Sequence, residues 1–379
     1  MKGISKIAII GGGIGGMCTA IQLKKQNFDV DLIEINSTLT PVGAGITLSA
    51  ATLRAFKEIG IIDQILQEGG ILNLVELYTS EGELIGQSPL QSAIGADELP
   101  GGVGIIRTKL AEILKNKLED LGVNIILNNT INEISQTSEQ VSIVLKDGEQ
   151  RVYDLLIGAD GVRSRVRNLI FPEFKGSQFT HQGSWRVVVP RLLENCAIFL
   201  GKELKAGMNP ISATQSYLYI LDHIEKDEII DPQQWSKLLS NLLSEFKGVI
   251  SDIKAQIDQG KITLEHIVYR PLSVHLMEGS WHKNRVVLLG DSIHATTPHL
   301  ASGAGIAIEG AIILSQELAK DQSLEEALTH YQKRHFERAK MVIETSVKLG
   351  QLEINNGSKL EHRSLMHSTL DALRQPLTV

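Results

Sequence analysis

Two patterns of hydrophobic and polar positions alternate along this chain. In the first, short apolar runs typical of buried parallel strands are followed by glycines or by apolar residues at helical spacing. In the second, apolar and polar residues alternate one by one between polar turns, which is typical of antiparallel strands. The first pattern predicts strands over 7–10, 30–33, 155–159 and 286–289, helices carrying Leu53, Phe56 and Ile59 and carrying Leu110, Ile113, Leu114 and Leu118, and a long apolar helix over 306–319.

The second pattern occupies 72–87 and most of 176–270. Its first part turns near Glu81 and Gly82, which predicts a β-hairpin. Later runs predict more strands, and one helical stretch over 232–246 interrupts them. A further hairpin is predicted to turn at Asp147 and Gly148.

Together the two patterns predict an α/β fold, in which a Rossmann-like nucleotide-binding domain is interrupted by insertions that build a mostly antiparallel β-sheet domain. The length of 379 residues suits about two domains. The predicted boundaries assign 1–71, 101–175 and 271–350 to the nucleotide-binding domain, 72–100 and 176–270 to the substrate domain, and 351–379 to a polar C-terminal tail or helix.

Composition narrows the class of protein. The net charge of -7 argues against a nucleic-acid binder, which needs a basic surface. No apolar run reaches the roughly 18 residues of a membrane span. Cys18 falls inside the first predicted helix, and the two cysteines of the chain suggest neither a disulfide framework nor a metal cluster. We expect a cytoplasmic protein, monomeric or homodimeric, without a nucleic-acid partner.

The segment 6–34 has the arrangement of a dinucleotide-binding βαβ unit. Gly11, Gly13 and Gly16 form G-x-G-x-x-G between a predicted strand and a helix. The first glycine of this motif permits the turn, the second admits a pyrophosphate at the helix N-terminus, and the third lets helix pack on strand. Glu34 follows about 20 residues later, where an acid accepts hydrogen bonds from ribose hydroxyl groups. The segment therefore predicts a site for FAD or NAD.

Two further motifs lie far along the chain, IGADGVRSRVR at 157–167 and LLGDSIHATTPHLASGAG at 288–305. With the glycine motif they resemble, in the same order, the group A FAD-dependent aromatic hydroxylases, flavoprotein monooxygenases related to p-hydroxybenzoate and salicylate hydroxylases. The resemblance covers most of the chain. It implies bound FAD, transient NADPH or NADH, and O2, with a C4a-hydroperoxyflavin that hydroxylates an electron-rich aromatic or heteroaromatic small molecule.

Several residues acquire expected roles. Asp291 follows a predicted buried strand, and an acid at the carboxyl end of such a strand lies in the ligand crevice; in the family the matching acid holds a ribityl hydroxyl. Asp160 is expected to hold backbone and the neighbouring Arg163 or Arg165. Backbone N–H groups of 303–305 can face the pyrimidine edge of a flavin. The cofactor-binding residues assigned by the motifs and the resemblance are Gly11, Gly13, Ile14, Gly15, Gly16, Glu34, Gly45, Ile46, Arg107, Asp160, Gly161, Gly290, Asp291, Pro298, Gly303, Ala304 and Gly305.

The substrate side is less marked in the sequence. Trp185 and Arg186 resemble a W-R pair at the start of the second sheet, and Tyr217 and Tyr219 fall on one face of a strand. Arg186, Tyr217 and Tyr219 are candidate substrate contacts, and Arg54 is a candidate for lining the flavin. No residue is assigned a covalent catalytic role, because a flavin itself carries the chemistry.

Departures from the family and alternative functions remain. Ala301 and Ser302 replace a glycine and a glutamine that relatives commonly carry, and Gly310 follows Glu309 where many relatives have an acid. The alternatives are a flavin monooxygenase acting on an antibiotic, a purine or an alkene, and, more distantly, an NAD-binding dehydrogenase or redox-sensing module. No metal site is expected, because the histidines at 275, 282, 294 and 299 lack the spacing of zinc ligands.

Overall fold

The computed structural model describes residues 4–40 and 43–377, and its first sheet is mainly parallel. Six strands lie in the order β18-β19-β12-β1-β2-β8, and only the β18–β19 pair is antiparallel. The four strands predicted from the first pattern all occur in this sheet, with ends that differ by at most one residue. Their bounds and those of the outer strands are β1 Lys6–Ile10, β2 Asp29–Ile33, β8 Asn124–Ile126, β12 Leu155–Gly158, β18 His282–Lys283 and β19 Val286–Leu288.

The second large sheet is antiparallel apart from one pair. Its order is β20-β17-β13-β16-β15-β14-β5-β6, and only β14 and β5 run parallel. The predicted hairpin before Gln87 is confirmed as β5–β6. The strands are β5 Leu74–Thr79, β6 Leu84–Pro89, β13 Gln178–Pro190, β14 Cys196–Leu200, β15 Lys205–Pro210, β16 Gln215–His223, β17 Ile267–Leu276 and β20 His294–Ala295. This sheet and the parallel one together confirm the predicted α/β fold with an interleaved, mostly antiparallel sheet.

Two helices cover one face of the antiparallel sheet. α6 (Pro232–Leu243) and α7 (Val249–Asp258) bury apolar side chains against Trp185 and Tyr269 in a separate hydrophobic cluster. The helix predicted over 232–246 is present as α6 but ends three residues earlier, at Leu243. The sequence did not predict α7, which begins after Gly248, whose φ of 59° lies in the left-handed region.

Two three-stranded antiparallel sheets complete the β structure. β3 (Gly45–Ser49) and β4 (Gly70–Leu72) flank β7 (Gly102–Ile106). β9 (Ile131–Gln136), β10 (Val141–Leu145) and β11 (Gln150–Tyr153) form a meander, which confirms the hairpin predicted at Asp147 and Gly148. The remaining early helices are α1 Ile14–Lys25, α2 Ala50–Ile59, α3 Ile62–Glu68, α4 Arg107–Asp120 and α5 Arg165–Ile170.

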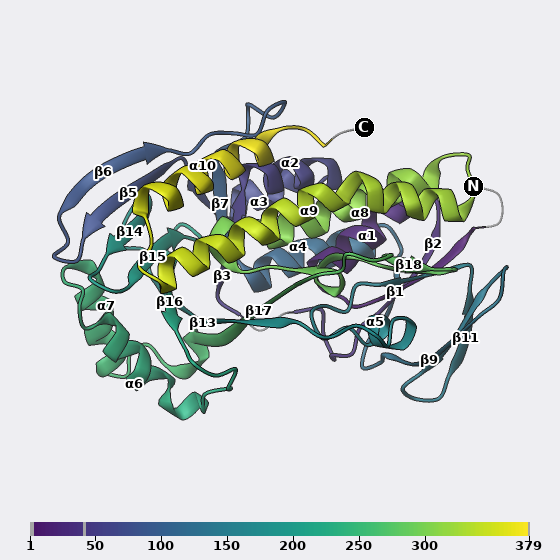
Figure 1. The fold of residues 1–379 in the computed structure, drawn as a ribbon, viewed down its shortest axis with the longest axis horizontal. Helices are drawn as coiled ribbons and strands as arrows, with labels where there is room; N and C mark the ends of the chain where they lie inside the picture. The colour runs from purple at the N-terminus through teal and green to yellow at the C-terminus, as the bar shows by residue number, and fades with distance from the viewer. Residues whose placement is uncertain (1–3, 41–42, 378–379) are drawn as a thin grey trace.

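Three consecutive helices end the described chain. α8 (Gly303–Ala319) packs on α1 and α2, and the 31-residue α9 (Leu324–Ile354) packs along α8. Figure 1 shows α9 crossing the molecule with α10 (Lys359–Arg374) beside it. The segment predicted as a polar tail or helix is therefore helical through most of its described length.

An ion pair between α8 and α9 is almost completely buried. Glu309 is 2% exposed and accepts hydrogen bonds from Nε and Nη2 of Arg338, at 2.7 and 2.9 Å. The same guanidinium donates to the Leu373 carbonyl oxygen at 2.6 Å, near the end of α10. One arginine thus joins all three C-terminal helices.

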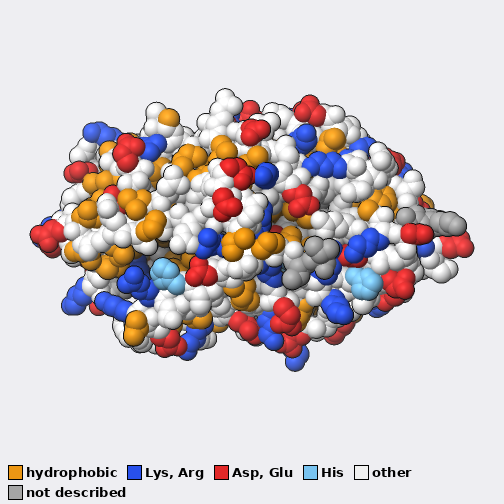
Figure 2. Space-filling view, turned by 90° about the horizontal axis from the view of Figure 1, so that it is seen from above, with side chains coloured by type: hydrophobic (Ala, Val, Ile, Leu, Met, Phe, Trp, Pro, Cys, Tyr) orange, Lys and Arg blue, Asp and Glu red, His pale blue; other side chains and the backbone are white. Residues whose placement is uncertain are grey.

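The outer surface is mixed in charge. Figure 2 shows Lys and Arg side chains interspersed with Asp and Glu over the face it displays. Across residues 4–40 and 43–377, none of the helices has the length and apolar character that crossing a bilayer requires.

Replacing Arg338 with methionine should leave the Glu309 carboxylate buried without its cation. We expect the free energy of unfolding to fall by about 3 kcal/mol, the usual cost of breaking a buried ion pair. The double variant Glu309→Leu/Arg338→Met should recover much of this loss. Urea denaturation of the three proteins measures it, and equal stability of wild type and Arg338→Met would contradict the role of the pair.

Candidate functional site

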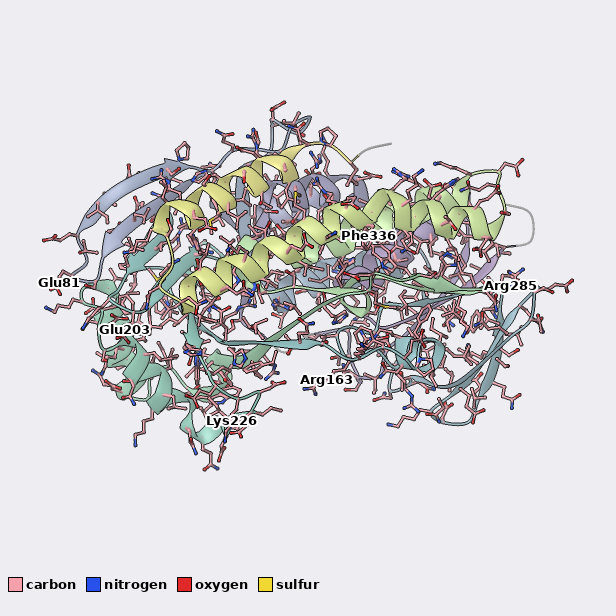
Figure 3. All side chains as sticks on the ribbon, in the orientation of Figure 1. Glu81, Arg163, Glu203, Lys226, Arg285 and Phe336 are labelled. Carbon is pink, nitrogen blue, oxygen red and sulfur yellow. The ribbon has the colours of Figure 1, made fainter. Side chains whose placement is uncertain are left out.

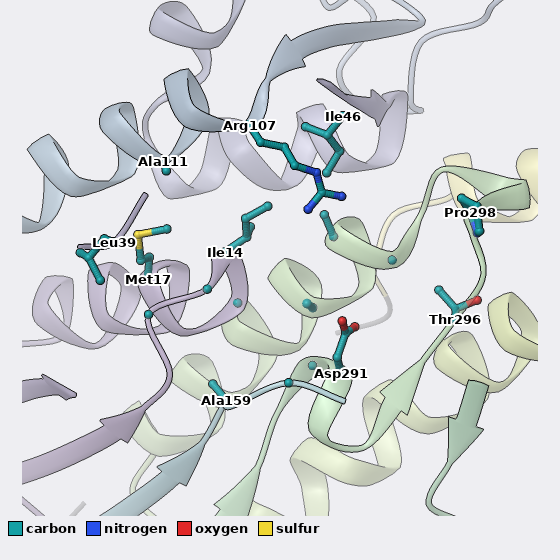
Figure 4. Close-up of a pocket in the computed structure, with 18 of the residues that line it drawn as sticks. Ile14, Met17, Leu39, Ile46, Arg107, Ala111, Ala159, Asp291, Thr296 and Pro298 are labelled. Atoms are coloured by element: carbon teal, nitrogen blue, oxygen red, sulfur yellow. The ribbon is translucent and has the colours of Figure 1, made fainter. Parts of the chain in front are cut away.

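The carboxyl ends of four adjacent parallel strands meet at one edge of the first sheet. The loops after β19, β12, β1 and β2 bring Asp291, Gly161, Gly13 and Glu34 to this edge. Ligands of open α/β sheets bind at such an edge. All four residues line one cleft of about 460 Å³, part of which is shown in Figure 4.

The three motif glycines differ in what surrounds them. A Cβ on Gly16 would lie 1.9 Å from the Gly11 carbonyl oxygen, and one on Gly11 would lie 2.3 Å from the Ala159 carbonyl oxygen. Gly11 also has a φ of 111°. No atom lies within 4 Å of a Cβ built on Gly13, which faces the cleft. Two of the glycines therefore permit close backbone packing, and the third keeps the cleft open.

The Glu34 carboxylate holds the glycine loop through a backbone hydrogen bond. One oxygen accepts a hydrogen bond from the Gly12 N–H at 2.6 Å, and the other accepts from the Asn36 N–H at 2.9 Å. Glu34 is 8% exposed and still contributes to the cleft wall. Its contact with a ribose remains a prediction.

Two cations and one carboxylate face the middle of the cleft. Figure 4 shows the Arg107 guanidinium and the Asp291 carboxylate pointing into the cleft from opposite sides. Burial, with a smaller contribution from the nearby Arg186, lowers the pKa of Arg107 to about 10. The Asp291 side chain is exposed to the cleft. The protein around the cleft still desolvates its carboxylate, which raises the pKa of Asp291 to about 6, and the charge of Arg107 opposes this shift.

Two helix N-termini also face this space. α1 begins after Gly13 and α8 begins after Ser302, and neither of these N-cap residues accepts a hydrogen bond from its helix through a side chain. Gly303 and Ala304, in the first turn of α8, line the cleft. Free N–H groups and the helix dipole favour anions at both places. α8 begins three residues before the predicted 306, because packing overrides the low helix propensity of its glycines.

The second large sheet supplies the opposite wall. Arg186 from β13 and Tyr217 from β16 line the cleft. The Tyr217 hydroxyl lies 2.6 Å from Thr47 Oγ1, and Asn209 Nδ2 donates to Thr47 Oγ1 at 2.9 Å and to the Tyr217 hydroxyl at 3.3 Å. This network fixes the phenol ring at the junction of β3, β15 and β16.

Most of the predicted site residues meet in the cleft. Those that line it are Gly13, Ile14, Gly15, Glu34, Ile46, Arg107, Gly161, Gly290, Asp291, Pro298, Gly303 and Ala304, with Arg186 and Tyr217 on the substrate side. Their contacts with cofactor and substrate remain predictions.

The other predicted residues support the cleft from behind. Gly45 and Gly305 leave room for Tyr217 and Thr52, since an added Cβ would lie 2.5 Å from each of those side chains. Gly11 and Gly16 pack backbone on backbone, as described above. The Tyr219 ring lies beside that of Tyr217, tilted by 37° with ring centroids 5.6 Å apart. None of these five residues is part of the described lining.

Asp160 also acts from behind the lining. Its carboxylate accepts hydrogen bonds from the backbone N–H groups of Arg165 and Val166, at 2.7 and 3.0 Å, at the start of α5. The expectation that it holds backbone is confirmed, whereas the Arg165 side chain turns away to Asn132, at 2.8 Å. Arg163 is exposed, as Figure 3 shows at the edge of the molecule.

Arg54 was wrongly expected to line the flavin. Its guanidinium donates to the carbonyl oxygens of Arg374 and Gln375, at 2.6 and 2.7 Å, and so caps the C-terminal end of α10. Sequence separation of more than 300 residues concealed this contact.

Sequence reasoning missed a group of small polar residues. The cleft lining also contains Asn36, Thr38, Thr40, Thr47, Thr296 and Thr297. Asn36, Thr38 and Thr40 lie within six residues after Glu34, so their position after a strand end was an available signal. Thr47 could not be found this way, because it lies within β3.

A histidine–carboxylate cluster anchors the loop after Asp291 to α9. Thr297 Oγ1 lies 2.7 Å from His299 Nδ1, and His299 Nε2 lies 3.1 Å from the Glu353 carboxylate. His362 and Lys205 contact the other Glu353 oxygen, at 3.0 and 2.8 Å. Although burial alone would raise the pKa of Glu353, these partners hold it well below its usual range.

The other histidines flagged in the sequence have protein partners. His275 Nε2 lies 3.2 Å from the Arg167 guanidinium, His294 Nε2 lies 3.3 Å from His335 Nε2, and His282 faces Glu325 at 3.8 Å. Among the residues the structure describes, no three His, Cys, Asp or Glu side chains converge as metal ligands would.

Known proteins resemble this chain over most of its length. A family model described as "FAD binding domain" matches residues 5–346. The 2-heptyl-3-hydroxy-4(1H)-quinolone synthase of Pseudomonas aeruginosa is 30% identical over 317 residues, which cover 82% of this chain and 80% of that enzyme.

Solved structures share the whole fold. Klebsiella pneumoniae HpxO, complexed with FAD and uric acid, has a TM-score of 0.84 at 21% identity and covers 99% of this chain and 94% of its own. The 2-methyl-3-hydroxypyridine-5-carboxylic acid oxygenase has a TM-score of 0.78 at 25% identity and covers 99% of each chain.

Gly13→Leu should abolish FAD binding without unfolding the protein. The new side chain would enter the cleft beside the N-terminus of α1, where Gly13 leaves open space. Gly86→Leu is a matched control, since Gly86 lies in β6 with equally open surroundings. Flavin absorbance after reconstitution, with the melting temperature, measures both effects. Full flavin content in Gly13→Leu would show that the cleft is not the cofactor site.

Glu353→Gln should destabilise the protein at neutral pH but not in acid. The folded-state pKa of Glu353 is depressed, so its contribution is complete above the unfolded pKa of about 4.3 and is lost as the pH falls below it. The stability difference from wild type should therefore shrink between about pH 5 and pH 3. Urea denaturation across this range, with Glu344→Gln as exposed control, tests it. A difference independent of pH would refute the role of the cluster.

Proposed function

The chain belongs to the FAD-binding domain family and is an FAD-dependent monooxygenase, and from this premise we propose that it oxygenates an electron-rich heteroaromatic small molecule with O2 and NADPH or NADH. The observation that carries the proposal is the pair of arginines in the cleft, which suits the anionic oxygen of a deprotonated ring. Arg107 and Arg186 both line it, and within the described part of the chain neither makes a side-chain hydrogen bond or salt bridge.

The cleft suits FAD by its own chemistry. Gly13 leaves an open cradle at a helix N-terminus, where backbone N–H groups bind phosphate. We propose that Glu34 accepts a hydrogen bond from a ribose hydroxyl and that Asp291 accepts one from a ribityl hydroxyl. The N-terminus of α8 would face the flavin pyrimidine edge. When bound, FAD supplies the electron transfer and oxygen activation, which no protein side chain has to perform.

Within this proposal the two sheets have different roles. The parallel sheet and its loops hold the cofactor, and the antiparallel sheet covers the substrate side, as the separate hydrophobic cores of the two parts support. The substrate domain would then comprise 72–100 and 176–270, although β17 runs unbroken across the second boundary.

The protein groups orient the substrate and keep it dry. The unpaired Arg186 guanidinium suits an anionic oxygen or a ring made electron-rich by loss of a proton. The Tyr217 hydroxyl, held by Thr47 and Asn209, is fixed to hydrogen-bond a substrate hydroxyl or N–H. Leu272 and Pro298 add apolar surface that limits water at the site.

The related proteins support a heterocyclic substrate. The names of the Pseudomonas enzyme and of the pyridine oxygenase refer to a quinolone and a hydroxypyridine, and HpxO was crystallised with uric acid, a purine. Each is a planar ring with polar substituents. A purine is therefore the second candidate substrate, and these relatives favour oxygenation over the alternatives of an NAD-binding dehydrogenase or a redox-sensing module.

Purified protein should be yellow, and a cognate heterocycle should accelerate its oxidation of NADH or NADPH. We would test 4(1H)-quinolone, 6-hydroxynicotinate, 2-methyl-3-hydroxypyridine-5-carboxylate and uric acid under labelled O2, with mass spectrometry of the products. One labelled oxygen atom in the product is expected. Nicotinamide oxidation without labelled product for any of the ring classes would contradict the proposal.

Arg186→Met should separate substrate binding from cofactor binding. Loss of one charge-assisted hydrogen bond should raise KM for the cognate substrate by about tenfold or more, with flavin content unchanged. Arg191→Met is the control, because Arg191 lies outside the cleft lining and bonds the carbonyl oxygens of its own turn. Unchanged KM in Arg186→Met would remove Arg186 from the substrate site.

A further inference from the structure

A second cavity of about 440 Å³ lies between the start of β13 and the C-terminal end of α9. It is separate from the cofactor cleft at the edge of the parallel sheet, but Thr297 lines both. Its volume is within the range of small-molecule sites, about 300–1,000 Å³.

Among the described residues, one polar side chain that reaches this cavity lacks a protein partner, and a second unpartnered one lies behind the wall. Gln182 from β13 is 3% exposed and Ser346 from α9 is 0% exposed. Within residues 4–40 and 43–377, neither side chain makes a hydrogen bond. Ser346 Oγ is closed off from solvent, so only the Gln182 amide can meet a ligand in the cavity. An unsatisfied buried polar group costs free energy, so such groups in native proteins call for an explanation. A ligand with a donor and an acceptor would satisfy the carbonyl oxygen and the NH₂ group of the Gln182 amide.

The closeness of the walls is built into the sequence. A Cβ on Gly350 would lie 2.6 Å from Gln182 Oε1 and 3.1 Å from His299 Cε1. Glycine at this position of α9 thus lets the helix approach both β13 and the loop that contains Thr297. Gln182 follows an irregularity in the strand, where His181 has a φ of 58°.

The lining limits the chemistry of a ligand. His181 and His223 are the ionisable residues in the described lining, which contains no Lys, Arg, Asp or Glu. Val274, Val347 and Ile354 add apolar surface, and the Phe179 ring packs on His181 with centroids 4.8 Å apart. Apolar and aromatic walls with amide and hydroxyl groups suit a flat, uncharged ring that hydrogen-bonds.

We propose that this second cavity binds a neutral planar heteroaromatic molecule of the class the enzyme oxygenates, held by the Gln182 amide. The ligand class rests on the proposed function, whereas the existence of the site does not. A molecule bound there would contact Thr297, whose hydroxyl is bonded to His299. The bound molecule would therefore lie next to the loop that also lines the cofactor cleft.

The test is calorimetric titration of the FAD-loaded protein with 4(1H)-quinolone, which carries one N–H donor and one carbonyl acceptor. Wild type should bind two molecules per chain. Gln182→Leu should weaken one of them by about tenfold or more, the loss expected for one hydrogen bond. Quinolone bound in the cleft should change the flavin absorbance spectrum, and in Gln182→Leu this change should be the same as in wild type. Arg186→Met should weaken only the molecule in the cleft.

A second variant tests the same cavity in case Gln182→Leu does not fold. Gln351→Trp would fill the rim of the cavity from an exposed position on α9, and it should also lose one bound molecule. Glu344→Trp, exposed two turns earlier on the same helix and outside the lining, should keep both.

The outcomes separate the two proposals. Wild-type isotherms in Gln182→Leu and Gln351→Trp, or binding of only one molecule that depends on Arg186, would overturn the second site. Binding that depends on Gln182, without any flavin spectral change or turnover, would uphold the second site and count against the proposed function.

Discussion

The structure depends on the close approach of the backbone after β1 to the end of β12 and the start of α1. Gly16 lies so near the Gly11 carbonyl oxygen, and Gly11 so near the Ala159 carbonyl oxygen, that neither position has room for a Cβ. This packing sets α1 directly on the strand ends. It also fixes the edge at which Glu34 and Asp291 arrive from neighbouring strands, so the geometry of the cleft follows from it.

The electrostatics of the cleft follow from the same arrangement. The N-termini of α1 and α8 and the guanidinium groups of Arg107 and Arg186 give it a positive character, which Glu34 and Asp291 only partly offset. Because Glu34 is already bonded to the glycine loop, it acts both as a brace and as a candidate ligand. A site of this kind suits a diphosphate and a ring that gains negative charge.

The C-terminal helices connect this site to the rest of the molecule. Arg338 joins α8 to α9 and α10, and the cluster around Glu353 ties the end of α9 to His299 in the loop beside the cleft. Gly350 brings the same helix against β13, which forms the second cavity. One long helix therefore contacts both the loop beside the cleft and the antiparallel sheet, so the two walls of the cleft are positioned together.

The sequence by itself determined the local motifs: the strand, glycine turn and acid of the βαβ unit, the hairpins, and the aspartate at 291, because their signals lie within a few neighbouring residues. It could not show that Gly45 and Gly305 make room for other side chains, or that Arg54 caps α10. Only the tertiary structure decided these, and only it joined Thr47, Asn209 and Tyr217 into one network. The physical reason is that such contacts depend on distances between segments remote in sequence, which residue periodicity does not encode.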